Sequence, residues 1–136
     1  MSLLEFDVTR WPLVIVLHPR SFEGDEIERS YTAWAKLCVR GPHAAFVDLR
    51  QLNPITASPT ARRRVATAVE SHRAAFERSL VAEARVIRGE VTRHVVAAFD
   101  WIAGSKFTRP LCNTTSIAEA EAFLLAELRR TGNLAQ

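Results

Sequence analysis

Apolar and polar positions along this chain alternate between short strand-like runs and longer helix-like stretches. Residues 3–9 alternate apolar and polar side chains, which predicts an edge strand with one buried face. The uninterrupted apolar runs at 13–17 and 44–49 predict strands that are covered on both sides. Two shorter strands are expected at 84–87 and 108–112.

Between these strands, apolar residues recur every three or four positions, which predicts amphipathic helices. Ser58-Pro59 is a strong helix start, because the serine oxygen accepts a free amide and proline has none to leave unpaired. Ser116 and Glu119 have the spacing of a capping box. The predicted helices cover residues 24–39, 58–80, 90–103 and 116–130.

The resulting order of elements is β-β-α-β-α-β-α-β-α. The helices are long enough to act as right-handed crossovers, so we expect an α/β fold with a mostly parallel open sheet and an antiparallel first strand. The 136 residues are expected to form a single domain over 1–136, with a frayed tail after Arg130.

Composition and charge narrow the classes of function. Hydrophobic residues make up 48% and charged residues 24%, as in ordinary globular domains. The net charge of +3 is too small to indicate nucleic-acid binding. The two cysteines lack metal-ligand spacing, so we expect free thiols, no metal and a cytoplasmic location. No segment resembles a signal peptide or a membrane span.

No arrangement of residues predicts catalysis. His18 and Asp48 end two predicted central strands, where open α/β sheets bind ligands, but a turn and a loop cap explain them equally. His72 lies on an apolar helix face and is interpreted as a core residue. The chain contains no GxSxG, GxGxxG or Walker pattern. We therefore expect a protein that is not an enzyme and has no cofactor.

Hydroxyl groups gather where the second helix begins. Thr56, Ser58 and Thr60 lie at a predicted helix N-terminus, where backbone amides and the helix dipole favour an anion or a phosphorylated hydroxyl. Ser58 thus has two interpretations, a helix cap or a phosphorylation or anion site. Arg62 and Arg63 follow one turn later and are either solvated charges or contacts to an acidic partner.

Nearly the whole chain, residues 6–128, resembles the STAS domain of bacterial anti-anti-sigma factors and its SpoIIAA-like relatives. The resemblance rests on the predicted N-terminal hairpin, on Val47-Asp48-Leu49 followed by Leu52, and on the closing strand and helix at 112–122. In phosphorylated members, Asp-Ser-Ser/Thr-Gly precedes the helix. Here the segment reads Thr56-Ala57-Ser58-Pro59, so Ser58 occupies the modified position while the acidic residue and the glycine are absent.

The resemblance implies a non-enzymatic regulatory module of bacterial signalling that binds another protein or forms a homodimer. Self-association is expected from the apolar strand at 13–17 and the surface candidates Trp101 and Phe107, since crossover helices can gather on one face of a sheet and leave the other short of cover. The alternative is a small-molecule or lipid-binding domain with a cavity between helices and sheet. An enzyme using His18 and Asp48 is the third class. Candidate partner-binding residues are Asn53, Arg62, Arg63, Trp101, Phe107 and Arg109.

Overall fold

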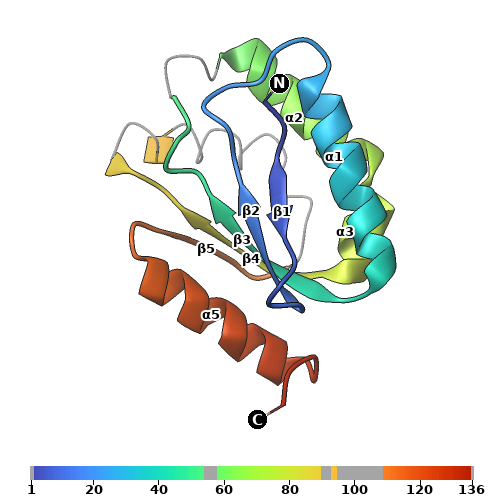
Figure 1. Ribbon diagram of the computed structural model, residues 1–136, viewed down its shortest axis with the longest axis vertical. Helices are drawn as coiled ribbons and strands as arrows, with labels where there is room; N and C mark the ends of the chain where they lie inside the picture. Colours follow the sequence, from blue (N-terminus) through green and yellow to red (C-terminus); the bar gives the residue numbers. More distant parts are fainter. Residues whose placement is uncertain (1, 54–57, 90–92, 95–108, 136) are drawn as a thin grey trace.

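The computed structural model describes residues 2–53, 58–89, 93–94 and 109–135, and these contain a five-stranded sheet. Its strands follow the chain order from β1 to β5, with β1 antiparallel to β2 and the other pairs parallel (Figure 1). The α/β class and the antiparallel first strand are therefore confirmed. The strands are β1 (Glu5–Asp7), β2 (Leu13–Leu17), β3 (His43–Asp48), β4 (Leu80–Val86) and β5 (Leu111–Thr114).

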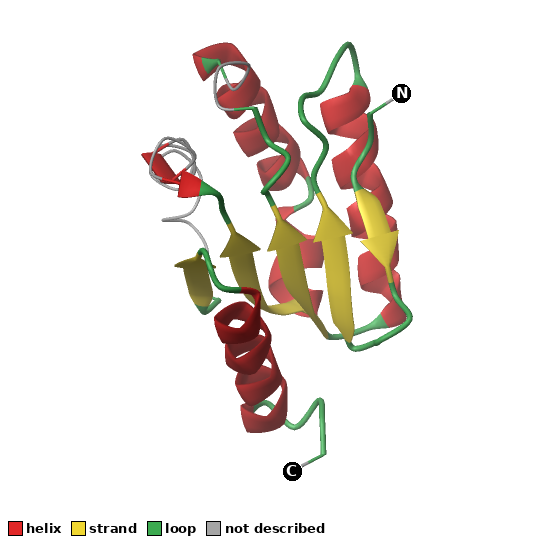
Figure 2. Ribbon diagram, turned by 60° about the vertical axis from the view of Figure 1, so that its left-hand side comes forward, coloured by secondary structure: helices red, strands yellow, loops and turns green. Residues whose placement is uncertain are grey.

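Helices cover both faces of the sheet. Three helices pack on one face and α5 lies on the opposite face, as Figure 2 shows. On the face that we expected to lack helices, α5 packs against β3, β4 and β5, while self-association itself stays a prediction. The predicted helix at 90–103 lies almost entirely outside the described residues. The described helices are α1 (Glu26–Leu37), a 3₁₀ turn (Cys38–Arg40), α2 (Pro59–Ser71), α3 (Arg73–Ser79) and α5 (Ile117–Arg130).

The core under α1 is aromatic and includes a buried histidine. The indole Nε1 of Trp34 donates to Nε2 of His43 at 3.2 Å, so the His43 proton lies on Nδ1, 3.2 Å from the carbonyl of Gly41. Burial lowers the pKa of His43 below its usual value and keeps the ring neutral. Phe76 of α3 packs edge-on against Trp34, with ring centroids 5.3 Å apart.

The core under α5 combines small strand residues with large helix residues. Ala44, Ala82 and Ala84 are fully buried, and they leave room for Leu124 and Leu128 of α5, which are equally buried. Close packing of this kind allows one helix to cover the face presented by three strands.

Three elements predicted along the second half of the chain had the wrong bounds. The helix predicted at 58–80 is divided at His72, where the backbone leaves helical geometry. Periodicity conceals this break, because Val69 before it and Phe76 after it reach the same core. The strand predicted at 84–87 begins at Leu80 instead. The last strand is Leu111–Thr114 instead of 108–112.

The extra length of β4 contains two buried charges. Glu83 and Arg85 have side chains that are each 7% exposed, and Arg85 Nε donates to Glu83 at 2.5 Å. Arg109 donates to the other carboxylate oxygen at 3.0 Å. Burial raises the pKa of Glu83, but the two arginines outweigh burial and bring it to about 2. Glu83, Arg85 and Arg109 thus form a buried ion group.

The final helix begins with the predicted cap. Ser116 Oγ accepts from the Glu119 amide at 3.1 Å. The Glu119 carboxylate does not return to Ser116; it accepts from the Thr114 hydroxyl, which in turn accepts from the Ser116 amide. After the helix, the Leu134 amide donates to the Leu128 carbonyl, and Leu134 packs against the core under α5. The chain stays attached to the domain beyond the predicted point of fraying.

Candidate functional site

The loops that follow the parallel strands β2, β3 and β4 all begin at the same edge of the sheet. The register pairs Leu17 of β2 with Asp48 of β3, and Asp48 with Val86 of β4. Backbone hydrogen bonds continue beyond the strand ends, from the His18 amide to Asp48 and from the Leu49 amide to Val86. The loops therefore leave the sheet side by side, as the carboxyl ends of parallel strands do.

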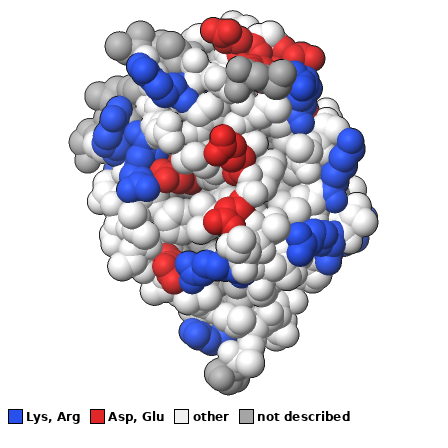
Figure 3. Space-filling model, viewed as in Figure 1, with Lys and Arg blue, Asp and Glu red and all other residues white. Residues whose placement is uncertain are grey.

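Each of these loops carries an arginine within three residues of its strand. Arg20 follows β2, Arg50 follows β3 and Arg88 follows β4. Together with Gln51 and Asn53 they line a hollow of about 370 Å³, which we call the carboxyl-end hollow. Lys and Arg side chains gather over the ends of β3 and β4 in Figure 3.

The middle arginine is held in place by the strand it follows. Arg50 Nε and Nη2 donate to the two carboxylate oxygens of Asp48 at 2.9 and 2.8 Å, and the Arg50 amide donates to Asp48 at 3.0 Å. These hydrogen bonds lower the pKa of Asp48 below its usual value. Asp48 is thus an ionised, paired carboxylate and does not act as a free base near neutral pH.

The two outer arginines, Arg20 and Arg88, differ from Arg50 in their contacts. Arg20 and Arg88 are exposed, and within the described part of the chain neither guanidinium has an ion pair or hydrogen bond. The Asn53 amide donates to the Arg20 carbonyl at 3.0 Å, which joins two of the loops. Among the described residues, the hollow therefore has two arginines without a carboxylate partner beside the Arg50–Asp48 ion pair.

His18 lies at the same edge but turns to structural contacts. Its Nδ1 donates to the Pro19 carbonyl at 2.7 Å, and its ring packs edge-on against Phe22 with centroids 4.9 Å apart. Burial lowers the pKa of His18, so the ring is neutral at pH 7. The described residues that line the hollow are arginines and amides, whose side chains supply hydrogen bonds but neither a base nor a nucleophile at neutral pH.

The predicted site at the start of α2 is a helix cap. Ser58 Oγ accepts from the Ala61 amide at 3.1 Å, as the cap interpretation requires. Ser58 and Thr60 are both exposed, and Thr56 lies outside the described residues. The alternative interpretation of Ser58, as a phosphorylation or anion site, is not tested by this geometry.

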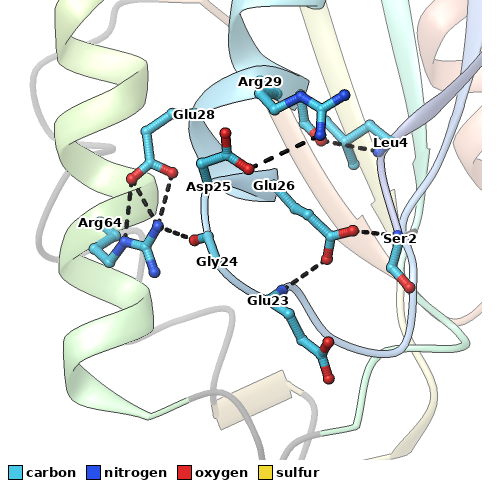
Figure 4. Close-up of polar contacts among 10 residues, drawn as sticks. Ser2, Leu4, Glu23, Gly24, Asp25, Glu26, Glu28, Arg29 and Arg64 are labelled. Carbon is cyan, nitrogen blue, oxygen red and sulfur yellow. Dashed lines mark hydrogen bonds and ion pairs between the residues drawn. The ribbon is translucent and has the colours of Figure 1, made fainter.

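The arginines that follow Ser58 divide into two kinds. Arg64 donates to both carboxylate oxygens of Glu28 and to the Gly24 carbonyl, and so connects α2 to the start of α1 (Figure 4). In the same region, the nearly buried Glu26 accepts from the Ser2 amide (Figure 4). Arg63 is exposed and Arg62 is half-buried. This surface is available only in part.

The other residues predicted to bind a partner lie in different places. Asn53 lines the carboxyl-end hollow, whereas Arg109 forms an ion pair with buried Glu83 and belongs to the protein interior. Trp101 and Phe107 lie outside the described residues. Sequence reasoning missed Arg20, Arg50 and Arg88, because they are far apart along the chain. The available signal was an arginine two or three positions after each of three consecutive strands.

Further features of the described residues concern metal binding, membrane-spanning helices and the reactivity of thiols. They contain no group of three side chains able to hold a metal ion, and no helix among them is long and apolar enough to cross a membrane. Cys38 and Cys112 are free thiols, and burial raises the pKa of Cys38 to about 11, which makes it unreactive at neutral pH.

Comparison with known proteins adds no family. The sequence matches no protein-family model, and no curated protein matches it. The resemblance to STAS domains therefore stays a prediction, and the site rests on its own geometry.

Proposed function

We propose that the protein is a non-enzymatic binding module that recognises an anionic ligand in the carboxyl-end hollow. The observation that carries this proposal is the convergence of Arg20, Arg50 and Arg88 from three consecutive parallel strands around about 370 Å³. That volume lies within the range of small-molecule sites, roughly 300–1,000 Å³.

The charges at the hollow favour an anion. A guanidinium presents a planar fork of donors that matches carboxylate and phosphate oxygens, and a hydrogen bond to a charged group contributes about 1.5–3 kcal/mol. Arg20 and Arg88 have no internal carboxylate within the described residues, so an external anion is a good partner for them. Gln51 and Asn53 add amide donors beside them.

A binding role also agrees with what lines the site. Arginine remains protonated in proteins, and amides do not take up protons near neutral pH. The nearest carboxylate, Asp48, is engaged by Arg50, and the His18 Nδ1 proton is engaged by a carbonyl. This arrangement supports capture of a ligand without chemical change.

The proposal adopts the ligand-binding alternative raised from the sequence, but at another location. The alternative expected a cavity between helices and sheet, whereas the carboxyl-end hollow is polar and lies beyond the strand ends. A regulatory role of the STAS kind remains compatible with it, with the anion as the signal that is sensed.

Phosphate binding to matched arginine variants tests the proposal. Inorganic phosphate is titrated into the wild type, and amide shifts are followed by NMR at low and high ionic strength. We expect Arg20→Ala/Arg88→Ala to weaken binding roughly tenfold or more, because two charge-assisted contacts are lost. The matched control is Arg78→Ala/Arg129→Ala, which removes the same charge from exposed sites in the last turns of α3 and α5.

The control variant should bind as the wild type does, and binding to the wild type should weaken with salt. No phosphate-dependent shift in the wild type, or equal weakening in both double variants, contradicts the proposal. An Arg63→Ala variant measured in parallel examines the surface at the start of α2. If Arg63→Ala alone abolishes binding, the site lies there and not in the hollow.

A further inference from the structure

The carboxyl-end hollow has its charge at two ends and not at its centre. Arg50 and Arg88 each follow the paired residues Asp48 and Val86 by two positions, so they leave the sheet at the same level on neighbouring strands. Arg20 leaves from β2, the neighbour on the other side. The three arginines thus form a row across β2, β3 and β4.

The central member of this row is neutralised. Both carboxylate oxygens of Asp48 accept from the Arg50 guanidinium, so this pair has little net charge. The flanking Arg20 and Arg88 have no such partner within the described residues. Neighbouring strands lie about 4.8 Å apart, so the backbones at the two ends are roughly 10 Å from each other.

The middle of the row is polar. Gln51 and Asn53 follow Arg50 on the central loop and line the hollow between the outer arginines. Amide groups both donate and accept hydrogen bonds, and so they match hydroxyl, carbonyl or amide groups of a ligand. Positive charge, a polar centre and positive charge therefore follow one another across the strand ends.

We infer that the hollow takes a small ligand with two anionic groups joined by a short polar spacer, a bisphosphate or a dicarboxylate. This inference rests on the proposed function. A single phosphate placed against one outer arginine leaves the other without a partner, whereas a ligand with two anionic ends meets both. The combined effect arises because the second contact is intramolecular once the first has formed.

The test compares ligands with one and two anionic ends. Calorimetric titrations use α,ω-dicarboxylates from malonate to adipate and α,ω-alkane bisphosphonates of the same lengths. Matched mono-anions are propionate and methylphosphonate. We expect the best bis-anion to bind the wild type roughly tenfold or more tightly than its mono-anion, with an optimum in spacer length. The two series identify which anionic group is preferred.

Single variants then show whether both ends are used. Arg20→Ala and Arg88→Ala should each reduce bis-anion binding to the level of the mono-anion, while Arg129→Ala should leave the wild-type preference intact. Mono-anions and bis-anions of equal affinity overturn this inference but leave the proposed function standing. Loss of the preference in only one of the two single variants also overturns it. If neither series binds the wild type, the proposed function itself fails.

Discussion

Arg85 and Arg88 are three residues apart, yet the fold uses them in opposite ways. Arg85 lies within β4, where its 7% exposed side chain is paired with Glu83. Arg88 lies beyond the strand end, where it is exposed and, among the described residues, has no ion pair. The same side chain thus stabilises the interior at one position and is available to a ligand at the other.

The difference follows from where each residue leaves the backbone. Within a strand, successive side chains point to opposite faces, so Glu83 and Arg85 must share one covered face. A buried charge is tolerated only with a partner of opposite charge, and Glu83 and Arg85 are such partners for each other. Beyond the strand end the alternation stops and water solvates the charge. Position relative to the strand end, more than residue type, decides the role of each arginine.

The largest effect is expected from breaking the buried group. Glu83→Gln removes the carboxylate that Arg85 and Arg109 share, and so breaks both of these buried ion pairs. We expect a loss of about 3–5 kcal/mol in the free energy of unfolding, measured by urea denaturation. Arg88→Gln is the control from the exposed group and should stay within about 0.5 kcal/mol of the wild type. Similar stabilities for the two variants would abolish the distinction between the groups.

The stability of the fold is expected to depend on pH through His18, His43 and Glu83. His18 and His43 have lowered pKa values in the fold, so below the usual value of 6.5 the unfolded chain binds protons first and stability falls. Glu83 acts in a lower pH window, because its pKa of about 2 in the fold lies below the usual glutamate value of 4.5. Its contribution is complete above pH 4.5 and is lost as the pH falls towards 2.

Thermal unfolding measured from pH 8 to pH 3 checks both windows. One proton contributes a slope of at most about 1.4 kcal/mol per pH unit. His43→Gln keeps groups that can accept from Trp34 and donate to Gly41, and it should reduce the loss below pH 6.5 without changing the loss below pH 4.5. A profile identical to that of the wild type would show that His43 titrates normally in the fold.

The smallest effect is expected at the start of α2. Ser58→Ala removes the oxygen that accepts from the Ala61 amide and should cost about 1 kcal/mol of unfolding free energy. Ser58→Asp should retain stability, because a carboxylate can also accept the cap hydrogen bond and its negative charge interacts favourably with the positive end of the helix dipole. An unchanged melting temperature for Ser58→Ala would mean that the cap contributes nothing and would favour a functional role for the hydroxyl.

Patterns among neighbouring residues were sufficient to predict several strands and helix starts. The apolar run at Leu13–Leu17 has the predicted bounds, and the next strand differs from its prediction by one residue at each end. The caps at Ser58 and Ser116 were also predictable, because a cap depends on residues three positions apart. Such features need only neighbours along the chain.

The early start of β4 and the carboxyl-end hollow were decided by tertiary structure. Glu83 resembles a surface residue until folding places it beside Arg109, and a partner 26 positions away cannot be inferred from hydropathy. Arg20 and Arg88 are brought to one edge only when their strands pair in parallel and in register on either side of β3. Sequence patterns alone were enough for β2, β3 and the two capped helix starts, because those patterns are local. Tertiary structure decided which charges meet, because that depends on the order and register of the strands.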